Sequence, residues 1–451
     1  MPGVFSLLRA VPGGGALLRY AAGLGVRGVE TIGKLGLYVA VGVRLGAHDA
    51  GLFFLCLTWI GVVSTAARLG LDRAMTRHIA AELAIGDGRA ARAALLQGLG
   101  LTSLAALVAA LLTVLVAEVA AVRLFGFPDL AWPLYLSALV LVPQTLAFSL
   151  GAALAGFGRG VAAQIVQNAL WPVLTLAALL AMPVAQEGGS LDGLIVALGV
   201  ALAASCVLGG FILLLERGRL RTSPVPVPTL AADGVPASPA ETEALPSLWT
   251  TARPLLVVEL TQVGLSGLPV FLLGMAADAA TVGAFSIASR ISMLIWVIII
   301  SIGTLAAPRY AALYRLGEMD QLRAYNRMVQ RGAALVAVPA ALVMLAFPDF
   351  LLGLISADFR VAAAALQILA LGQMANGLFS CQDILLAMTG RGDVLRRLNL
   401  LQLAVGLLLC GVLIPAFGLP GAALSASLVV LQGALGTHWA ARRYILNTEK
   451  N

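Results

Sequence analysis

Apolar runs of about 20 residues recur along the whole chain, and they restrict its fold more than any other feature. A helix needs a run of this length to cross the hydrocarbon core of a bilayer. The composition agrees, because 60% of the residues are hydrophobic, only 11% are charged, and the mean hydropathy is +0.96. Such values exclude a soluble globular protein. The runs do not alternate apolar with polar residues, which excludes a membrane β-barrel. The sequence therefore predicts an all-α polytopic membrane protein.

A long proline-rich break divides the apolar runs into two groups of six. It covers residues 216–251 and contains six prolines. Because Pro-rich sequence of low hydrophobicity cannot bury enough surface to fold, we expect a disordered cytoplasmic linker there. This linker separates an N-lobe at 21–215 from a C-lobe at 252–439, with cytoplasmic tails at 1–20 and 440–451. The twelve predicted transmembrane helices lie at about 21–45, 50–67, 93–117, 131–156, 161–183, 191–215, 252–275, 282–306, 332–352, 361–387, 397–414 and 419–439.

Positive charge marks one side of the predicted loops as cytoplasmic. The loops on the side of the N-terminus carry most of the arginines, whereas the opposite loops carry only Arg44, Arg123 and Arg360. An excess of Lys and Arg is typical of cytoplasmic loops, so we predict an N-in/C-in topology. The same rule explains the net charge of +7, and no nucleic-acid partner is expected. The basic loops at 68–92 and 309–331 could also attract anionic lipid head groups, although charge retention is the simpler explanation.

The two halves repeat each other at one constant offset along the sequence. Several matches involve Arg, Phe and Pro, for which chance agreement is less common than for Ala or Leu. Because each half has an even number of spans, both halves enter the membrane from the cytoplasm and the repeat is parallel. In transporters of this kind the substrate site lies near the midplane between the halves. The matches include Gly51 with Gly283, Phe53 with Phe285, Arg77 with Arg309, Phe127 with Phe359, Arg159 with Arg391 and Pro183 with Pro415.

The first predicted span carries a stripe of charged residues. Arg27, Glu30 and Lys34 lie within about 60° of one another on a helix, and Tyr38 continues the stripe. A cation near the bilayer centre costs at least about 2.5–3.5 kcal/mol, so such residues usually face a watery or protein-lined interior. We expect the stripe to line a central cavity that binds an anion. The alternative is a buried cluster in which Glu30 neutralises Arg27 and Lys34.

The repeat places a second set of polar residues opposite this stripe. Arg27 corresponds to Glu259 in the seventh span, and the eighth span adds Arg290. We expect Arg27, Lys34 and Arg290 to form a ladder of cations along the cavity, because Arg binds two phosphate oxygens at once and Lys acts as a point charge. Glu30 and Glu259 would balance those cations or carry a coupling proton. The alternative for Glu259 and Arg290 is a fixed ion pair that joins the halves.

Uncharged polar residues extend the candidate site. Gln262 corresponds to Glu30 in the repeat, and Gln144 and Asn376 lie in the fourth and tenth spans. Amides suit sugar hydroxyls, although in membranes they more often hold helices together. Asp383 is a further candidate for coupling or charge balance. Neither a metal site nor a cofactor is expected, because the four cysteines lack ligand spacing, although a coupling proton or sodium ion remains possible.

The turn between the first two spans, Val43 to Phe53, resembles the corresponding turn of polysaccharide (O-antigen-type) flippases. The Arg-rich loop that follows is similar too, and the two six-helix lobes extend the resemblance over the whole chain. These flippases belong to the multidrug/oligosaccharidyl-lipid/polysaccharide (MOP) exporter superfamily, whose lobes are MATE-like. The resemblance implies a bacterial inner-membrane protein that moves an undecaprenyl-pyrophosphate-linked oligosaccharide from the cytoplasmic to the periplasmic leaflet by alternating access. It also implies that Arg27, Lys34 and Arg290 meet the pyrophosphate.

Two other functions remain open at this point. A multidrug antiporter of the same superfamily would use Glu30, Glu259 or Asp383 to bind organic cations and would couple to protons or sodium. The three basic groups at cavity depth argue against it. A membrane-embedded glycan polymerase or ligase would need a sizeable external loop with catalytic groups, and the external loops here are short, so no enzyme is expected. The expected partners are a lipid-linked oligosaccharide, membrane lipids and glycan-assembly proteins, with the chain itself a monomer.

Overall fold

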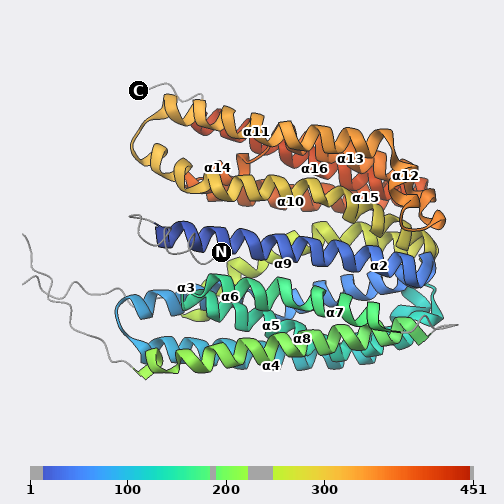
Figure 1. Ribbon diagram of the computed structural model, residues 1–451, viewed down its shortest axis with the longest axis horizontal. Helices are drawn as coiled ribbons and strands as arrows, with labels where there is room; N and C mark the ends of the chain where they lie inside the picture. The colour runs from blue at the N-terminus through green and yellow to red at the C-terminus, as the bar shows by residue number, and fades with distance from the viewer. Residues whose placement is uncertain (1–13, 183–188, 222–246, 447–451) are drawn as a thin grey trace, which may run out of the picture.

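Two lobes of helices make up the structure, a computed structural model that describes residues 14–182, 189–221 and 247–446. These residues are helical almost throughout, and no strand occurs among them. Figure 1 shows the helices of the two halves on opposite sides, with α2 (Gly14–Ala67) and α9 (Leu248–Ala276) between them. Eleven helices in this described part are long and apolar enough to cross a membrane. The predicted all-α polytopic membrane fold in two lobes is confirmed.

Helix α2 folds back on itself at Gly46. This residue has φ 74° and ψ −179°, a conformation that is essentially restricted to glycine. Tyr38 and Phe54 lie sixteen residues apart, which is about 24 Å along a straight helix, yet their ring centroids are only 5.7 Å apart. The two arms of α2 therefore run side by side, and they contain the predicted spans 21–45 and 50–67. Twelve membrane crossings and the N-in/C-in orientation remain predictions.

The N-lobe consists of α2 and the helices up to Arg221. Its α5 (Ala131–Gly156) has the limits predicted from the apolar run. A π-helical turn, η3 (Ile165–Ala169), joins α6 (Gly160–Gln164) to α7 (Leu170–Ala181), so these elements together form the fifth predicted span. The other elements of the lobe are α3 (Leu71–Ala84), α4 (Gly88–Val119), η1 (Ala120–Leu124), η2 (Pro128–Leu130), α8 (Gly189–Leu215) and η4 (Glu216–Arg221).

The C-lobe begins with α9 and contains the longest uninterrupted helix, α10 (Ala279–Arg315). The tenth predicted span breaks near Cys381, which has a left-handed φ of 61° and separates α13 (Ala363–Leu378) from α14 (Gln382–Met388). The remaining elements are α11 (Met319–Ala346), α12 (Pro348–Gly353), η5 (Ala357–Ala362), α15 (Gly392–Phe417), α16 (Leu419–Ala441) and η6 (Arg442–Leu446).

Helices extend a few residues beyond several of the predicted domain limits. Helix α2 already begins at Gly14, within the predicted tail 1–20, and helical structure continues from α16 to Leu446. Glu216–Arg221 and the first turn of α9 are helical, although both fall in the predicted linker. The rest of that linker, 222–246, lies outside the described residues. These differences share a cause, because the predicted ends follow the apolar runs, whereas a helix continues beyond them while its backbone hydrogen bonds are satisfied.

Helix α3 occupies a segment that was predicted to be a basic loop. Its buried residues include Leu71, Ala74, Met75 and Ile79, whose spacing of three and four residues gives one apolar face. The segment is too polar to cross a membrane, so a search for apolar runs passes over it. The helical period was nevertheless present in the sequence.

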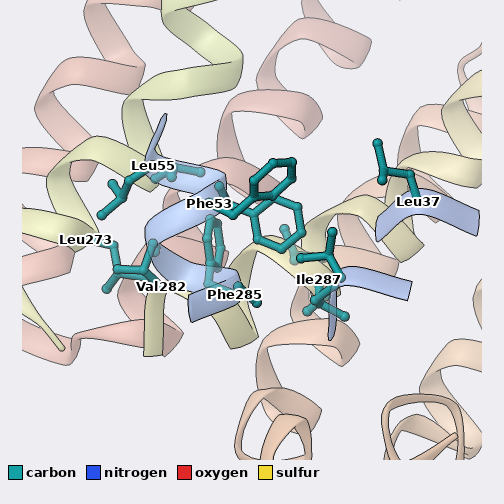
Figure 2. Close-up of a cluster of buried hydrophobic side chains, with 14 of the residues drawn as sticks. Leu37, Phe53, Leu55, Leu273, Val282, Phe285 and Ile287 are labelled. Carbon is teal, nitrogen blue, oxygen red and sulfur yellow. The ribbon is translucent and has the colours of Figure 1, made fainter. Parts of the chain in front are cut away.

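The lobes meet where α2 crosses α10, and this contact obeys the internal repeat. A Cβ atom at Gly51 would collide with the carbonyl oxygen of Ala279, and one at Gly283 would collide with that of Ala47. Under the offset that relates the two halves, Gly51 corresponds to Gly283 and Ala47 corresponds to Ala279. The contact is therefore reciprocal and confirms the predicted relation between the halves here. Figure 2 shows Phe53 beside its repeat partner Phe285 in the buried cluster at this crossing. The core is therefore continuous from one lobe to the other.

The first arm of α2 contacts the C-lobe near Gly46 and loses that contact toward its start. Near the bend, a Cβ atom at Gly42 would lie 2.6 Å from Ile355 and 3.0 Å from Phe359. At Gly23, Gly25 and Gly28 a Cβ atom would meet nothing within 4 Å. By contrast, α9 packs along the N-lobe over much of its length, from Gly274 against Leu55 to Leu256 against Gly70. The structure is thus closed at the Gly46 end and open beside the beginning of α2.

Candidate functional site

The charged stripe of α2 lies at the open end and is partly paired. Lys34 Nζ lies 2.7 Å from Glu30 Oε1, and the amide of Gln164 donates to the other carboxylate oxygen of Glu30. The side chains of Lys34 and Glu30 remain 27% and 16% exposed. The alternative interpretation is therefore confirmed for the pair of Glu30 with Lys34. Arg27 is half-buried one turn earlier, so the stripe carries one more positive than negative charge.

The indole ring of Trp171 on α7 lies beside the Lys34 ammonium. The Lys34 ammonium lies 5.7 Å from the centroid of the indole ring, close enough for a cation–π interaction. The indole N–H is buried and has no acceptor among the described residues. Gln164 and Trp171 flank η3, and π-helical turns are frequent at functional sites. The indole N–H is thus a donor without an acceptor in the described residues, close to the Lys34 ammonium, and two neighbouring donors favour an oxygen-rich anionic ligand.

Arg290 of α10 spans the junction of the two lobes. Its guanidinium lies 4.0 Å from the ring centroid of Tyr38 and 4.8 Å from that of Phe54, and these rings come from the two arms of α2. No carboxylate in the described part of the chain forms an ion pair with this guanidinium. The structure therefore brings together Arg290 and Tyr38, two predicted site residues, one turn beyond Lys34 on α2. Phe54 was not anticipated, because the predicted turn between the spans at 21–45 and 50–67 does not determine which residues of the second span face Arg290.

Glu259 forms an ion pair with Arg73 and not with Arg290. Its Oε1 lies 3.2 Å from Nε of Arg73 in α3, so the alternative pairing with Arg290 is wrong. The pair still joins the halves, because α9 packs against α3, where His78 also meets Thr251 at 3.2 Å. Burial near Arg77 lowers the pKa of His78, so its ring is neutral at pH 7. The second oxygen of Glu259 is buried without a hydrogen-bond partner in the described residues.

A second ion pair supports this contact from the N-lobe side. Arg68 Nη1 donates to Asp72 Oδ2 at 3.0 Å, and Ser149 of α5 donates to the other oxygen of Asp72 at 2.9 Å. The Arg68 guanidinium also lies 4.5 Å from the centroid of the Phe148 ring. Asp72 is buried, and its oxygens are bonded within the N-lobe. This cluster fixes the start of α3 and so positions Arg73 opposite Glu259.

The remaining predicted site residues do not join the stripe through any hydrogen bond or ion pair found in the described residues. Gln262 is exposed on α9, and Gln144 is half-buried on α5. Asn376 donates to Gln373 on its own helix at 3.4 Å, so this bond does not connect two helices. Asp383 is exposed in the first turn of α14. Their roles remain predictions.

Neither of two hollows at the surface of the described residues is lined by a predicted site residue. One, of about 570 Å³, lies at the bend of α2 and is lined by residues that include His48, Asp278 and Asp358. The other, of about 500 Å³, lies between the start of α4 and η4. The expected central cavity is not one of these two. Within the part of the chain that the structure describes, no three His, Cys, Asp or Glu side chains are grouped to hold a metal.

Comparison with known proteins places this geometry in context. The MatE family model matches residues 254–412, and no curated protein matches the sequence. The structure is similar to the inward-facing conformation of a MATE family multidrug resistance transporter of the MOP superfamily, with a TM-score of 0.70 and 16% identity over 96% of this chain and 100% of that chain.

Two further solved structures broaden the comparison. The lipid II flippase MurJ in an inward closed conformation gives a TM-score of 0.70 and 12% identity over 94% of this chain and 87% of that chain. A MOP superfamily transporter from Pyrococcus furiosus, described by a binding pocket of reverse polarity, gives a TM-score of 0.59 and 17% identity over 99% of both chains. The chain therefore has the two-lobe fold of the MOP superfamily transporters, and most of its C-lobe matches the MatE family model.

Proposed function

We propose that the protein is a flippase that moves a lipid-linked oligosaccharide, joined to undecaprenyl through pyrophosphate, from the cytoplasmic to the periplasmic leaflet by alternating access. The observation that carries this proposal is the environment of Arg290. Its guanidinium lies between the lobes against two aromatic rings and has no carboxylate partner in the described residues. A pyrophosphate would supply the missing negative charge, and the planar guanidinium binds two of its oxygens at once.

The surface of the first arm of α2 also fits an amphiphilic substrate. Val29 and Ile32 are 52% and 73% exposed, and they lie on the same arm as the half-buried Arg27 and Lys34. An apolar surface beside a cationic stripe matches a ligand in which a hydrocarbon chain is joined to a phosphate. The stripe lies at the open end of the structure, so such a ligand reaches it before the closed Gly46 end. In the predicted N-in orientation this opening faces the cytoplasm, where lipid-linked glycans are assembled.

A multidrug antiporter of the same fold is the second candidate, and one similar structure belongs to such a transporter. An antiporter of organic cations needs an accessible carboxylate. Glu30 is engaged by Lys34 and Gln164, and Glu259 is engaged by Arg73. Asp383 is exposed, but it lies on α14 and makes no hydrogen bond or ion pair with the stripe in the described residues. These pairs favour the flippase over the antiporter. We also propose that Glu30 or Glu259 carries a coupling proton or sodium ion, that the protein is a monomer of the bacterial inner membrane, and that it works with glycan-assembly proteins.

The test uses the whole protein in vesicles that contain a labelled polyprenyl-pyrophosphate oligosaccharide. Arg290→Gln and Lys34→Gln should each slow transfer between leaflets by about tenfold or more, because a hydrogen bond to a charged group contributes about 1.5–3 kcal/mol. Arg331→Gln, on the exposed face of α11, is the matched control and should transfer normally. Normal transfer in both site variants would overturn the assignment. Transport of an organic cation that depends on Glu30, Glu259 or Asp383 would instead establish the antiporter.

A further inference from the structure

A second basic site lies on the outer face of the N-lobe, away from the stripe of α2. The hollow of about 500 Å³ between α4 and η4 is lined by two arginines and three apolar residues: Arg89, Arg92, Ala93, Leu96 and Leu220. Figure 1 shows α4 at the edge of the molecule, on the far side of the N-lobe from α2. A ligand in this hollow would therefore not occupy the proposed transport route.

The hollow lies where the apolar surface of α4 begins. Arg89 and Arg92 occupy the first turns of this helix, just before the predicted span at 93–117. Beyond them, an exposed apolar stripe runs along α4, with Leu96 58% exposed and Leu111 60% exposed. Such a stripe belongs to the hydrocarbon of the bilayer, so the arginines lie at the level of the lipid head groups. The site is thus cationic at the level of the head groups and apolar toward the hydrocarbon, which matches the two parts of an anionic phospholipid.

The carboxylates nearby are already bonded. Glu216 is buried and pairs with Arg159 at 2.6 Å and with Arg219 at 3.4 Å. Asp87 caps α4 by accepting from the backbone N–H groups of Arg89 and Ala90 at 3.0 and 2.9 Å. Within the described residues no carboxylate forms an ion pair with the guanidinium of Arg89 or Arg92. The hollow therefore retains an excess of positive charge.

The internal repeat shows that this pair of arginines is specific to the N-lobe. At the offset that relates Gly51 to Gly283, Arg89 corresponds to Gln321 and Arg92 to Ala324. The C-lobe retains other cytoplasmic arginines, so retention of positive charge on this side does not require a pair at these two positions. The pair occurs only in the lobe whose α4 adjoins η4 to form the hollow.

We propose that this hollow binds the head group of an anionic phospholipid from the adjoining leaflet. Arg89 and Arg92 would hold the phosphate, and the acyl chains would lie along Leu96 and the apolar stripe of α4. Such a lipid would brace α4 against η4 at the end of the N-lobe. The proposal is independent of the transported substrate, because it uses none of the residues on α2, α9 or α10.

The test compares lipid binding to the purified full-length protein by native mass spectrometry, with thermal unfolding as a second readout. The Arg89→Gln/Arg92→Gln double variant should bind phosphatidylglycerol about 30-fold more weakly, because each arginine near a membrane surface contributes about 1 kcal/mol. Its thermal stabilisation by phosphatidylglycerol should disappear. The control Arg327→Gln/Arg331→Gln, on α11, should bind like the unaltered protein. Phosphatidylcholine should stabilise none of them.

A second variant distinguishes a shaped site from diffuse attraction. Leu96→Trp keeps both arginines and places a bulkier side chain in the lining of the hollow, so it should also weaken binding of phosphatidylglycerol while the protein remains monodisperse. Unchanged binding in Leu96→Trp or in the double arginine variant would overturn the proposal. Equal stabilisation by inorganic phosphate would overturn it as well, because it would show a free-anion site that does not require a lipid.

Discussion

At the scale of single residues, Arg290 shows how this fold holds a cation between its lobes without a carboxylate. The rings of Tyr38 and Phe54 supply an attractive face on the α2 side. A cation–π contact contributes about 0.5–2 kcal/mol, depending on its exposure to solvent. A charged hydrogen bond to a phosphate contributes about 1.5–3 kcal/mol, so an arriving pyrophosphate can draw Arg290 away from the rings. An ion pair with a buried carboxylate would compete far more strongly with the substrate.

A pair of substitutions at Tyr38 tests the role of the ring. Tyr38→Phe keeps the ring face and should leave the thermal midpoint of the purified protein unchanged. Tyr38→Leu removes the cation–π contact and should lower that midpoint by a few degrees, in line with a loss of about 0.5–2 kcal/mol. Differential scanning fluorimetry in detergent measures both. Equal destabilisation by the two substitutions would show that the hydroxyl group, not the ring, holds Arg290.

Charge pairs within a helix were predictable, whereas pairs between helices were not. Glu30 and Lys34 are four residues apart on α2, and that spacing alone places their side chains together. The alternative partner of Glu259, Arg290, is wrong, because the actual partner Arg73 lies in a segment whose polarity predicts a loop. Once that segment is known to be α3, a helix that packs on α9, the pair with Glu259 follows. The reversal of α2 that brings Phe54 to Arg290 likewise depends on the conformation of one glycine, Gly46.

At the scale of elements, α3 ties α9 to the N-lobe although α9 begins the C-lobe. The contact combines an apolar patch of Leu71, Ala74 and Ala252 with the ion pair of Arg73 and Glu259. Gly70, with a left-handed φ of 70°, allows the backbones to approach closely here. Glu259 is thus a residue of an inter-lobe contact in the conformation observed. An experiment can distinguish this structural role of Glu259 from the proposed role in carrying a coupling proton.

The experiment compares matched neutral variants of Arg73 and Glu259, the two residues of the ion pair. Arg73→Gln and Glu259→Gln both remove the ion pair, so both should weaken the contact of α3 with α9 by a similar amount. If Glu259 also carries the coupling proton, only Glu259→Gln should flatten the pH dependence of transport in vesicles between pH 5.5 and 8. Identical pH profiles in both variants and the unaltered protein would eliminate the coupling role. Cysteine accessibility at Thr251 gives an independent measure of the contact.

At the scale of the whole molecule, the repeat predicts two equivalent contacts between the lobes, one of α9 with the N-lobe and one of the first arm of α2 with the C-lobe. Only the contact of α9 extends over much of the length of its helix. The N-lobe chain breaks at Leu69 and Gly70, where φ is positive, and α3 turns to meet α9. The equivalent residues, Ser301 and Ile302, lie inside the unbroken α10. The beginning of α2 therefore has no counterpart of α3 to pack against. The constant offset between the halves reveals the symmetric crossing, but the departure from symmetry depends on a backbone conformation that the repeat does not encode.

Alternating access requires the closed Gly46 end to open, and a disulfide cross-link tests this directly. A Cβ atom at Gly42 would lie 2.6 Å from Ile355, so cysteines at these positions would face each other across the lobes. The four native cysteines, all free, are first replaced by serine or alanine. Oxidation of Gly42→Cys/Ile355→Cys should then stop transport in vesicles, and reduction should restore it.

The matched control is a cross-link within one lobe. A Cβ atom at Gly98 would lie 3.6 Å from Cβ of Met75, a spacing that suits a disulfide between α3 and α4. Oxidation of Gly98→Cys/Met75→Cys should leave transport intact, because α3 and α4 move together with the N-lobe. Transport that continues when the Gly42–Ile355 cross-link is complete would mean that the lobes need not part at this end. The substrate would then have to leave through the side that is already open, and alternating access could not be the mechanism.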